Sequence, residues 1–380
     1  MKLEQTSFTQ AAGWQPAAPG SLPEADLVLI FASTAQLEDG ACLTEINQAY
    51  PGAFVFGCST AGEIHGTHVS DESVSVTAVR FEHTRVQYAG IHMFEVGDSL
   101  GAGTRLAGLL PHEDLVHVFV LSDGLAVNGS ELVKGLSAAL PPGVSITGGL
   151  SGDGGRFEKT LVVLGGKAEA DAVGVVGLYG GALTVGYASL GGWDSFGPER
   201  LVTRSEGNVL YELDGRSALD LYKQYLGEEA KGLPATGLLF PLSLRIGEGD
   251  TPVVRTILAI DEEKQSMTFA GDVPEGAYVR LMKANFDRLI DGAAGAARAT
   301  RATGGRSSPD LAILISCGGR KMVLKQRVEE EVEGVRDVLG ERTALTGFYS
   351  YGEISPFTPN ARCELHNQTM TITTFTEHAA

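Results

Sequence analysis

The sequence lacks the marks of a metal-binding, secreted or membrane-spanning protein. Its four cysteines, Cys42, Cys58, Cys317 and Cys363, show no C-x-x-C spacing of the kind that holds a metal. The first residues contain neither the basic nor the apolar region of a secretory signal. No apolar run reaches the roughly 18 residues that a membrane span requires. We therefore expect a soluble, cytoplasmic protein without membrane insertion and without a metal site.

Positive charge is also scarce. Lysine and arginine together number 29, against 47 aspartates and glutamates, which gives a formal net charge of -18. Nucleic acids and anionic membranes attract basic surfaces. The charge balance therefore argues against either of them as a partner.

Glycine, in contrast, is abundant and is spread through apolar segments. The chain has 50 glycines in 380 residues. This distribution favours many tight turns in a folded α/β protein over disorder. Because the chain is long for a single core, we expect two fused halves, residues 26–215 and 216–380, after a polar, loosely docked lead-in over residues 1–25.

One eight-residue pattern occurs twice, near opposite ends of the chain. Gly57–Ile64 and Gly347–Ile354 both read G-x-x-[ST]-x-G-E-I, and Gly148–Asp153 is a looser copy between them. Each copy follows a short apolar segment. Two glycines permit unusual backbone or close approach, a hydroxyl can donate and accept, and an acid adds charge or a cap. A single copy would be read as a tight turn, but three copies favour a ligand cavity shared between the units.

The context of the pattern repeats as well. Apolar runs typical of buried strands, Leu27–Ala32, Val116–Leu121 and Leu311–Ser316, each precede a helical pattern and then a strand that ends in the Gly-hydroxyl-Gly-acid turn. We therefore predict an α/β fold with mixed β-sheets and flanking helices, built from repeated β-α-β-β units in two fused halves.

Helical periodicity predicts helices in several places. They cover Ser33–Tyr50, Ser130–Leu140 with Asn128 or Ser130 as its cap, and Lys321–Leu339. A further helix is expected where Tyr278, Met282, Phe286 and Leu289 would share one face.

These segments resemble the FIST family of sensory domains. Gly57–Ile64 with Val74–Phe81 resembles its N-terminal half. Five further segments, in the family's order, resemble its C-terminal half: Leu221–Gly227, Phe240–Leu242, Ser316–Arg320, Gly347–Pro356 and Leu365–Thr369. The resemblance covers residues 25–377 and implies an intracellular, non-enzymatic module that binds a small molecule such as an amino acid.

The resemblance also implies a role in signal transduction. Such domains are often coupled to histidine kinases of two-component systems, cyclic-dinucleotide enzymes or chemoreceptors. No part of the chain remains for an output domain, so we expect the signal to pass to a separate protein. A stand-alone branch of the family implies the alternative of a haem-binding nitric-oxide sensor, with His65 or His366 as the candidate haem ligand.

The candidate ligand-binding residues follow from the repeated turns and from the loop at Cys317. Backbone N–H groups, two glycines and Arg320 make the Cys317–Arg320 loop suited to a carboxylate, with Glu63 or Glu353 available for an ammonium group. A tight strand-to-helix loop, with Arg320 paired to an acid, is the plainer alternative. The predicted set comprises Ser59, Thr60, Glu63, Ser151, Asp153, Cys317, Arg320, Tyr349, Tyr351, Glu353 and Asn367.

Catalysis is a second alternative. Cys58 or Cys317 would act as a nucleophile on a small amino compound if a neighbouring histidine lowered its thiol pKa. A buried cysteine that packs as a small apolar residue is the commoner case. We therefore expect no enzyme and no cofactor, with haem kept as the alternative.

Overall fold

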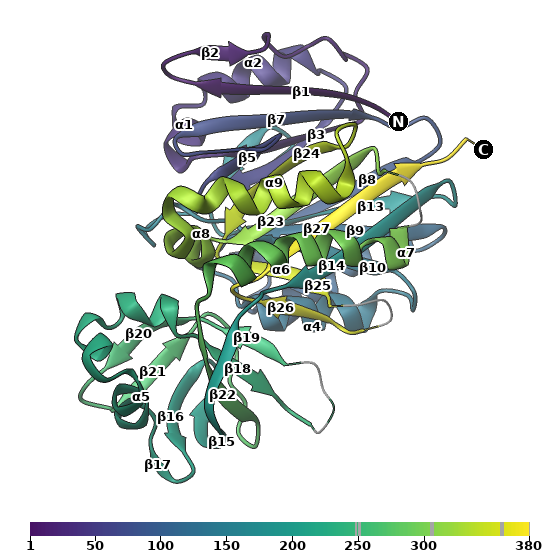
Figure 1. Cartoon of the computed structure of the whole chain (residues 1–380). Coiled ribbons are helices and arrows are strands. Elements are labelled where there is room, and N and C mark those ends of the chain that lie inside the picture. Colours follow the sequence, from purple (N-terminus) through teal and green to yellow (C-terminus); the bar gives the residue numbers. More distant parts are fainter. Residues whose placement is uncertain (248, 250–251, 305–307, 358–360, 380) are drawn as a thin grey trace.

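Figure 1 shows the computed structural model of the chain, which describes residues 1–247, 249, 252–304, 308–357 and 361–379. The described residues form four β-sheets. Three of them, of seven, six and six strands, build a main body with helices on its outside. The fourth, of eight strands, forms a smaller lobe at the lower left of the view. The fold is the mixed α/β class that the sequence predicts.

The first sheet contains a parallel pair and an antiparallel return strand. Strand β3 (Leu27–Ala32) runs parallel to β4 (Phe54–Ser59) and antiparallel to β7 (Ser73–Arg80). Two helices, α1 (Thr34–Asp39) and α2 (Ala41–Ala49), connect the parallel pair. The single helix predicted over Ser33–Tyr50 is therefore wrong, because Gly40 takes a left-handed φ of 72° and ends α1.

The other two sheets of the main body contain the same arrangement. In the second, β9 (Leu115–Ser122) is parallel to β10 (Ser145–Leu150) and antiparallel to β13 (Ala172–Tyr179). In the third, β23 (Leu311–Cys317) is parallel to β24 (Ala344–Ser350) and antiparallel to β27 (Met370–Glu377). The same part of the molecule also contains two further strands, β8 (Arg85–His92) and β14 (Leu183–Leu190). Its helices there are η1 (Met93–Glu95), α3 (Ser99–Leu109), α4 (Gly129–Ala139), α6 (Phe286–Ala299), α7 (Arg301–Gly304), α8 (Gly318–Leu324), η4 (Lys325–Arg327) and α9 (Val328–Leu339).

One predicted helix begins where expected, and another is broken into shorter helices. Helix α4 begins where expected, since the Asn128 side chain accepts hydrogen bonds from the N–H groups of Ser130 and Glu131. The helix predicted over Lys321–Leu339 is instead divided into α8, η4 and α9, because Lys325 takes a positive φ of 52°. Helix α3, which the sequence reading missed, packs against α4.

Each sheet of the main body receives a hairpin from the turn of another. Strand β5 (Glu63–His65), which follows the first repeated turn, pairs with β24 in the third sheet. Strand β25 (Gly352–Pro356), after the last turn, pairs with β10 in the second. Strand β11 (Val162–Leu164), after the middle turn, pairs with β4 in the first. The hairpins are completed by β6 (His68–Ser70), β26 (Cys363–His366) and β12 (Lys167–Glu169).

The first glycine of each repeated turn has a common steric cause. Gly57, Gly148 and Gly347 lie opposite Ile30, Val120 and Leu314 in the parallel pairs. A Cβ atom at any of the three would lie 1.8 Å from the carbonyl oxygen of its opposite residue. The repeated glycine is therefore required by the close approach of two parallel strands.

The core lies where the three sheets face one another. One cluster of buried side chains draws on all three, and within it the rings of Phe31 and Phe348 stack with centroids 4.7 Å apart. Helices cover the outer faces. Helices α3 and α4 enclose a second cluster with the second sheet, and α6 and α9 enclose another with the third. Figure 1 shows α6 and α9 lying across the front of the main body.

The smaller lobe is inserted between β14 and α6. Its elements are β15 (Asp194–Glu206), β16 (Val209–Leu213), β17 (Arg216–Ser217), α5 (Ala218–Leu226), η2 (Gly227–Gly232), η3 (Ala235–Leu239), β18 (Leu242–Arg245), β19 (Val253–Arg255), β20 (Ile257–Asp261), β21 (Ser266–Phe269) and β22 (Tyr278–Lys283). The expected division between residues 215 and 216 falls inside this lobe. Residues on both sides of it therefore build the lobe together.

Two sequence predictions fail in these regions. The helix face from Tyr278 to Leu289 does not exist, because Tyr278–Lys283 is a strand in which Val279 and Leu281 are buried and their neighbours face outward, a period of two. The lead-in is also not loosely docked. Strand β1 (Lys2–Thr9) pairs with all eight residues of β7, and β2 (Gly13–Gln15) extends the sheet.

Candidate functional site

The three repeated turns meet in the middle of the main body. The N–H of Ala61 donates to the Tyr349 carbonyl at 2.8 Å, and the N–H of Tyr351 donates to the Leu150 carbonyl at 3.2 Å. The N–H of Gly152 completes the ring of contacts by donating to the Ser59 carbonyl at 2.9 Å. Segments as far apart in the sequence as Ala61 and Tyr349 are thus joined through their main chains.

The repeated glutamates face inward and bind the protein's own backbone. Glu353 accepts from the Ser350 hydroxyl at 3.0 Å and from the Thr369 N–H and hydroxyl at 3.0 and 2.8 Å. Glu63 accepts in the same way from the Thr60 hydroxyl and from the N–H and hydroxyl of Ser73. In both copies the acid holds the start of the antiparallel return strand, so the motif has a structural role.

Burial changes the protonation of both acids. It raises the pKa of Glu63 to about 7, against the lowering effect of the donors from Thr60 and Ser73 and of the Lys321 charge. It raises the pKa of Glu353 to about 8, against the donors from Thr369 and Ser350. A fraction of each carboxyl group is therefore protonated near neutral pH.

The middle copy uses its acid to shape a loop. Asp153 accepts from the N–H groups of Phe157, Glu158 and Lys159 at 2.8 to 2.9 Å and from the Tyr351 hydroxyl. The hydroxyls of this neighbourhood are engaged too, since Ser151 accepts from the Gly124 N–H and Ser59 from the Leu161 N–H. These contacts fix the loop of residues 154–159 over Tyr351.

Arg320 is fully used within the protein. Its guanidinium binds Glu331 through Nε and Nη2, and its other donors reach the carbonyls of Gly191, Gln368 and Leu289. All five N–H groups have a protein partner, and neither Arg320 nor Glu331 is exposed. Tyr349 donates to the same Glu331, at 2.7 Å. The geometry thus matches the plainer alternative for Arg320, a pair with an acid, although that pair is buried.

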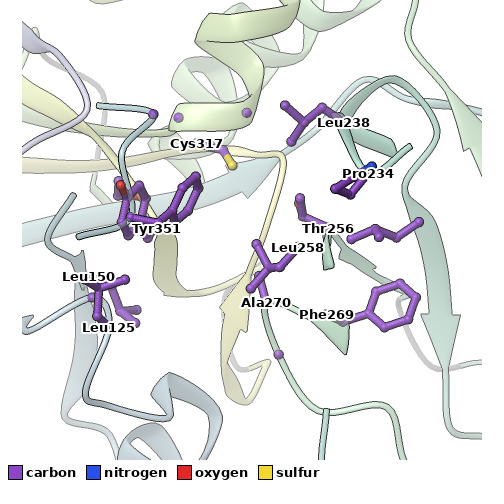
Figure 2. A pocket seen from close by; sticks show the side chains of 18 of the residues that line it. Leu125, Leu150, Pro234, Leu238, Thr256, Leu258, Phe269, Ala270, Cys317 and Tyr351 are labelled. Carbon is purple, nitrogen blue, oxygen red and sulfur yellow. The ribbon is translucent and has the colours of Figure 1, made fainter. Parts of the chain in front are cut away.

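A cavity of about 700 Å³ opens beside these turns, between the main body and the smaller lobe. Figure 2 shows Leu125, Leu150 and Tyr351 on one side of it and Pro234, Thr256 and Leu258 on the other. Its lining residues are Gly124–Gly129, Leu150, Gly154, Gly155, Phe157, Asn208, Gly232–Ala235, Leu238, Thr256–Leu258, Phe269–Gly271, Cys317–Gly319, Met322, Ser350 and Tyr351.

The position of the cavity follows from the sheet topology. Strands β9, β10, β23 and β24 all end at it, through Gly124, Leu150, Cys317 and Ser350. Ligand sites of open α/β sheets lie outside the carboxyl ends of their strands. The cavity has that position and a volume suited to a small molecule.

Of the predicted ligand-binding residues, Cys317 and Tyr351 line the cavity. Ser59, Thr60, Glu63, Ser151, Asp153, Arg320, Tyr349, Glu353 and Asn367 lie behind its wall or deeper in the main body. Sequence reasoning missed the loop Gly124–Gly129 and the whole contribution of the smaller lobe. The end of the Val116–Leu121 strand would have indicated the loop, whereas no sequence pattern indicated the lobe.

The two cysteines proposed as nucleophiles are buried thiols. Burial raises the pKa of Cys317 to about 12, with the Glu353 charge acting in the same direction and the N–H groups of Gln368, Gly319 and Arg320 opposing it. Burial also raises the pKa of Cys58 well above its usual range. Both therefore remain protonated at neutral pH, the form that is a poor nucleophile.

The histidines considered as haem ligands lie away from the cavity. His65 contacts the Ser75 hydroxyl, and His366 contacts the Ser355 carbonyl at 2.7 Å in the interior. Burial lowers the pKa of His366 to about 4. Neither lines the cavity, so haem placed there would need another axial ligand. The residues named for haem do not fit that group at this site.

The described residues contain neither a metal-binding cluster of side chains nor a membrane-spanning helix. Within residues 1–247, 249, 252–304, 308–357 and 361–379, no group of three or more histidine, cysteine, aspartate or glutamate side chains is placed to hold a metal ion. In the same described ranges, no helix has both the length and the apolar character needed to cross a bilayer.

Comparison with known proteins identifies the family. The FIST N domain matches residues 26–216, and the FIST C domain matches residues 218–356. The chain therefore belongs to the FIST family, whose domains are regarded as small-ligand sensory domains in signal transduction.

Two individual proteins are similar to the chain. An uncharacterized protein of Methanocaldococcus jannaschii is 27% identical over 184 residues, which cover 45% of this chain and 35% of the relative. The chain thus spans little more than a third of that relative's length. Among solved structures, cyanuric acid hydrolase from A. caulinodans aligns over 78% of this chain and 100% of its own, with 10% identity and a TM-score of 0.19. A likeness of that size has no weight for fold or activity.

Proposed function

We propose that this protein is an intracellular sensor that binds a small molecule in the cavity between the main body and the smaller lobe. One observation carries the proposal: residues of both parts line the same cavity. A ligand seated there would contact Leu125 and Tyr351 of the main body together with Pro234 and Leu258 of the lobe. Binding would therefore favour one relative placement of the two parts.

The connection between the two parts suits such a change. Within the described residues, the chain passes from the main body to the lobe between Leu190 and Asp194 and returns between Lys283 and Phe286. Polar contacts between the parts include Asn128 with Asp272 and Arg255 with the Leu365 carbonyl. An apolar cluster also joins the parts, with Leu239 and Val254 of the lobe packed against the cluster that contains Val323 and Leu324. Two short connections are where a hinge between the parts would lie.

The output of the sensor is proposed to pass through a separate partner. A histidine kinase of a two-component system or a cyclic-dinucleotide enzyme is the proposed class, on the basis of the family resemblance. Closure of the lobe would alter the surface around the cavity mouth, and a partner that binds this surface would respond to the change. The family resemblance implies a small molecule, such as an amino acid, as the ligand.

Native mass spectrometry of the protein purified from cells tests ligand binding. We expect a small-molecule adduct that is strongly reduced in Ala235→Trp, where an indole added at a lining residue would occupy part of the cavity. Ala138→Trp, on the exposed side of α4, is the matched control and should keep the adduct. An adduct retained in Ala235→Trp, or no adduct in any form of the protein, would contradict the proposal.

A further inference from the structure

The cavity wall is notable for its lack of charge. Of the described residues that line it, none is an aspartate, glutamate, lysine, arginine or histidine. Several are glycines, which present only backbone to a ligand. Burying a charged ligand group without a partner of opposite charge is costly. The wall as built suits a molecule without net or local charge.

The charges behind the wall do not change this conclusion. On the main-body side, Glu353 has a pKa of about 8 and is mostly uncharged at neutral pH, and Asp153 is already paired with backbone N–H groups, the Tyr351 hydroxyl and Arg156. On the lobe side, Arg255 is buried and its guanidinium donates to the carbonyls of Asp272, Val254 and Leu365. Neither side therefore offers a ligand anion or cation a countercharge that is not already engaged within the protein.

Apolar side chains are exposed at the mouth of the cavity. Leu125, Phe157, Leu258 and Met322 all line it, yet each is between 39% and 48% exposed. Most large apolar side chains of the protein are buried. Four exposed ones around a single opening indicate that an apolar surface covers them in the bound state.

Two of the lining residues form an aromatic platform. The rings of Phe157 and Tyr351 stack with centroids 4.5 Å apart and planes inclined by 14°. Phe157 takes a positive φ of 55°, which is rare for a large side chain, and its N–H is held by Asp153. The loop and the acid thus hold Phe157, which is 48% exposed and lines the cavity, in a stacked position on Tyr351.

The wall also contains one unsatisfied polar atom. Thr256 is 4% exposed and its hydroxyl has no hydrogen-bond partner within the described residues. Other polar side chains of the lining, such as Asn208, Ser350 and Tyr351, bind protein groups. Less than 1 Å² of that oxygen is accessible, so the hydroxyl lies behind the cavity surface and offers a ligand no hydrogen bond.

From these observations we infer that the cavity takes an uncharged, largely apolar molecule with an aromatic or other flat ring. The flat ring lies on Phe157. The inference rests on the proposed function, since it names the ligand class of the same cavity. It separates such molecules from free amino acids, which carry two charges at neutral pH.

A matched pair of fluorescent probes tests the ligand class. N-phenylnaphthylamine is neutral, and anilinonaphthalene sulfonate has the same ring skeleton with an added anionic group. We expect the neutral probe to bind at least about ten-fold more tightly than the sulfonate, because an unpaired charge is costly to bury. Tryptophan, which is zwitterionic and aromatic, should not displace the neutral probe.

Variants locate the binding. Phe157→Ala should weaken binding of the neutral probe about five- to ten-fold, since stacked aromatic contacts are among the stronger apolar contacts. Phe94→Ala is the matched control, because Phe94 is exposed and lies outside the cavity. Leu258→Lys should weaken the neutral probe and strengthen the sulfonate, whereas Leu109→Lys, at an exposed leucine of α3, should change neither.

The possible outcomes separate the two proposals. If the sulfonate or tryptophan binds as tightly as the neutral probe, and Ala235→Trp abolishes that binding, the ligand class is wrong and the sensor proposal stands. If no probe binds, the ligand class is wrong and the sensor proposal is decided by the adduct measurement alone. If Ala235→Trp leaves both the adduct and the binding of every probe unchanged, both proposals fail at this cavity. If Phe157→Ala and Phe94→Ala bind the neutral probe equally well, the ligand does not stack on Phe157, and the inferred ligand class is wrong.

Discussion

Arg320 and Glu331 form an ion pair with 2.6 Å between Nη2 and Oε2, and neither side chain reaches solvent. The pair links the start of α8 to α9 across the end of β23. It lies directly behind Gly318 and Gly319 of the cavity wall. Because each buried charge needs the other as its countercharge, the pair fixes the position of α8 relative to α9.

Breaking this pair should be strongly destabilising. We expect Glu331→Gln to lower the free energy of unfolding by about 3–5 kcal/mol, since it leaves a buried arginine without its countercharge. Urea denaturation followed by circular dichroism measures the change. Glu212→Gln is the control, because its partner Arg204 is largely exposed and such pairs contribute about 1 kcal/mol or less. Equal losses in the two variants would show that the buried pair has no special weight.

Stability should fall as the pH rises from 6.5 to 8. The folded-state pKa values of Glu63 and Glu353, about 7 and about 8, exceed their usual value of 4.5, so the folded state retains protons that the unfolded state has lost. Each carboxyl group that stays protonated contributes stability that is complete below pH 4.5. That contribution then declines by about 1.4 kcal/mol per pH unit until the folded pKa is reached.

The interval from pH 6.5 to pH 8 avoids the opposing effect of two buried histidines on stability. Burial lowers the pKa of His117 to about 3 and of His366 to about 4, so their contribution rises with pH up to about 6.5 and is constant above it. Urea unfolding at pH 6.5 and pH 8 is the measurement. Glu353→Gln should show a smaller loss between the two values than the natural protein. A stability that is constant or rising over this interval would refute the assignment.

Adding a methyl group to a repeated glycine should disrupt the main body. Gly347→Ala is expected to cost about 3 kcal/mol or more, because the new Cβ would lie 1.8 Å from the Leu314 carbonyl oxygen and the parallel strands cannot part locally. Thermal unfolding reports the loss. Gly108→Ala, in α3 with open space around it, should instead stabilise by about 0.5–1 kcal/mol. Similar effects of the two substitutions would mean that the sheet tolerates the extra atom.

Loss of the Asp153 carboxylate should loosen one wall of the cavity. Asp153→Ala removes the acceptor for three backbone N–H groups and the Tyr351 hydroxyl, so the loop of residues 154–159 should open locally. Hydrogen exchange measured by mass spectrometry should show faster exchange there, about ten-fold or more, with little change in α9. Uniformly faster exchange throughout the chain would instead indicate global destabilisation.

The strands of the main body were largely predictable. Continuous apolar runs such as Leu27–Ala32 mark strands buried on both faces, and β3 has those bounds. Three similar turns predicted a common meeting point, and their main chains do meet. In these segments the apolar composition of the sequence matches the burial that the fold gives them.

The site was less predictable for physical reasons. A sequence pattern does not show which way a side chain faces, so Glu63 and Glu353 were read as ligand contacts although their carboxylates bind Ser73 and Thr369. The cavity exists only where the lobe meets the main body, and half of its wall has no motif. Tyr278 was assigned to a helix because short apolar patterns fit either period.

The exchange of hairpins among the three sheets also bears on how the chain is synthesised. The first sheet needs no strand beyond β12, so it can close once residue 169 has left the ribosome. The second needs β25 and β26, and the third needs β5 from the amino-terminal region as well as β27. Both keep unpaired edges until β25, β26 and β27 have been translated, and a nascent chain arrested before Gly352 would expose strands prone to association with other chains.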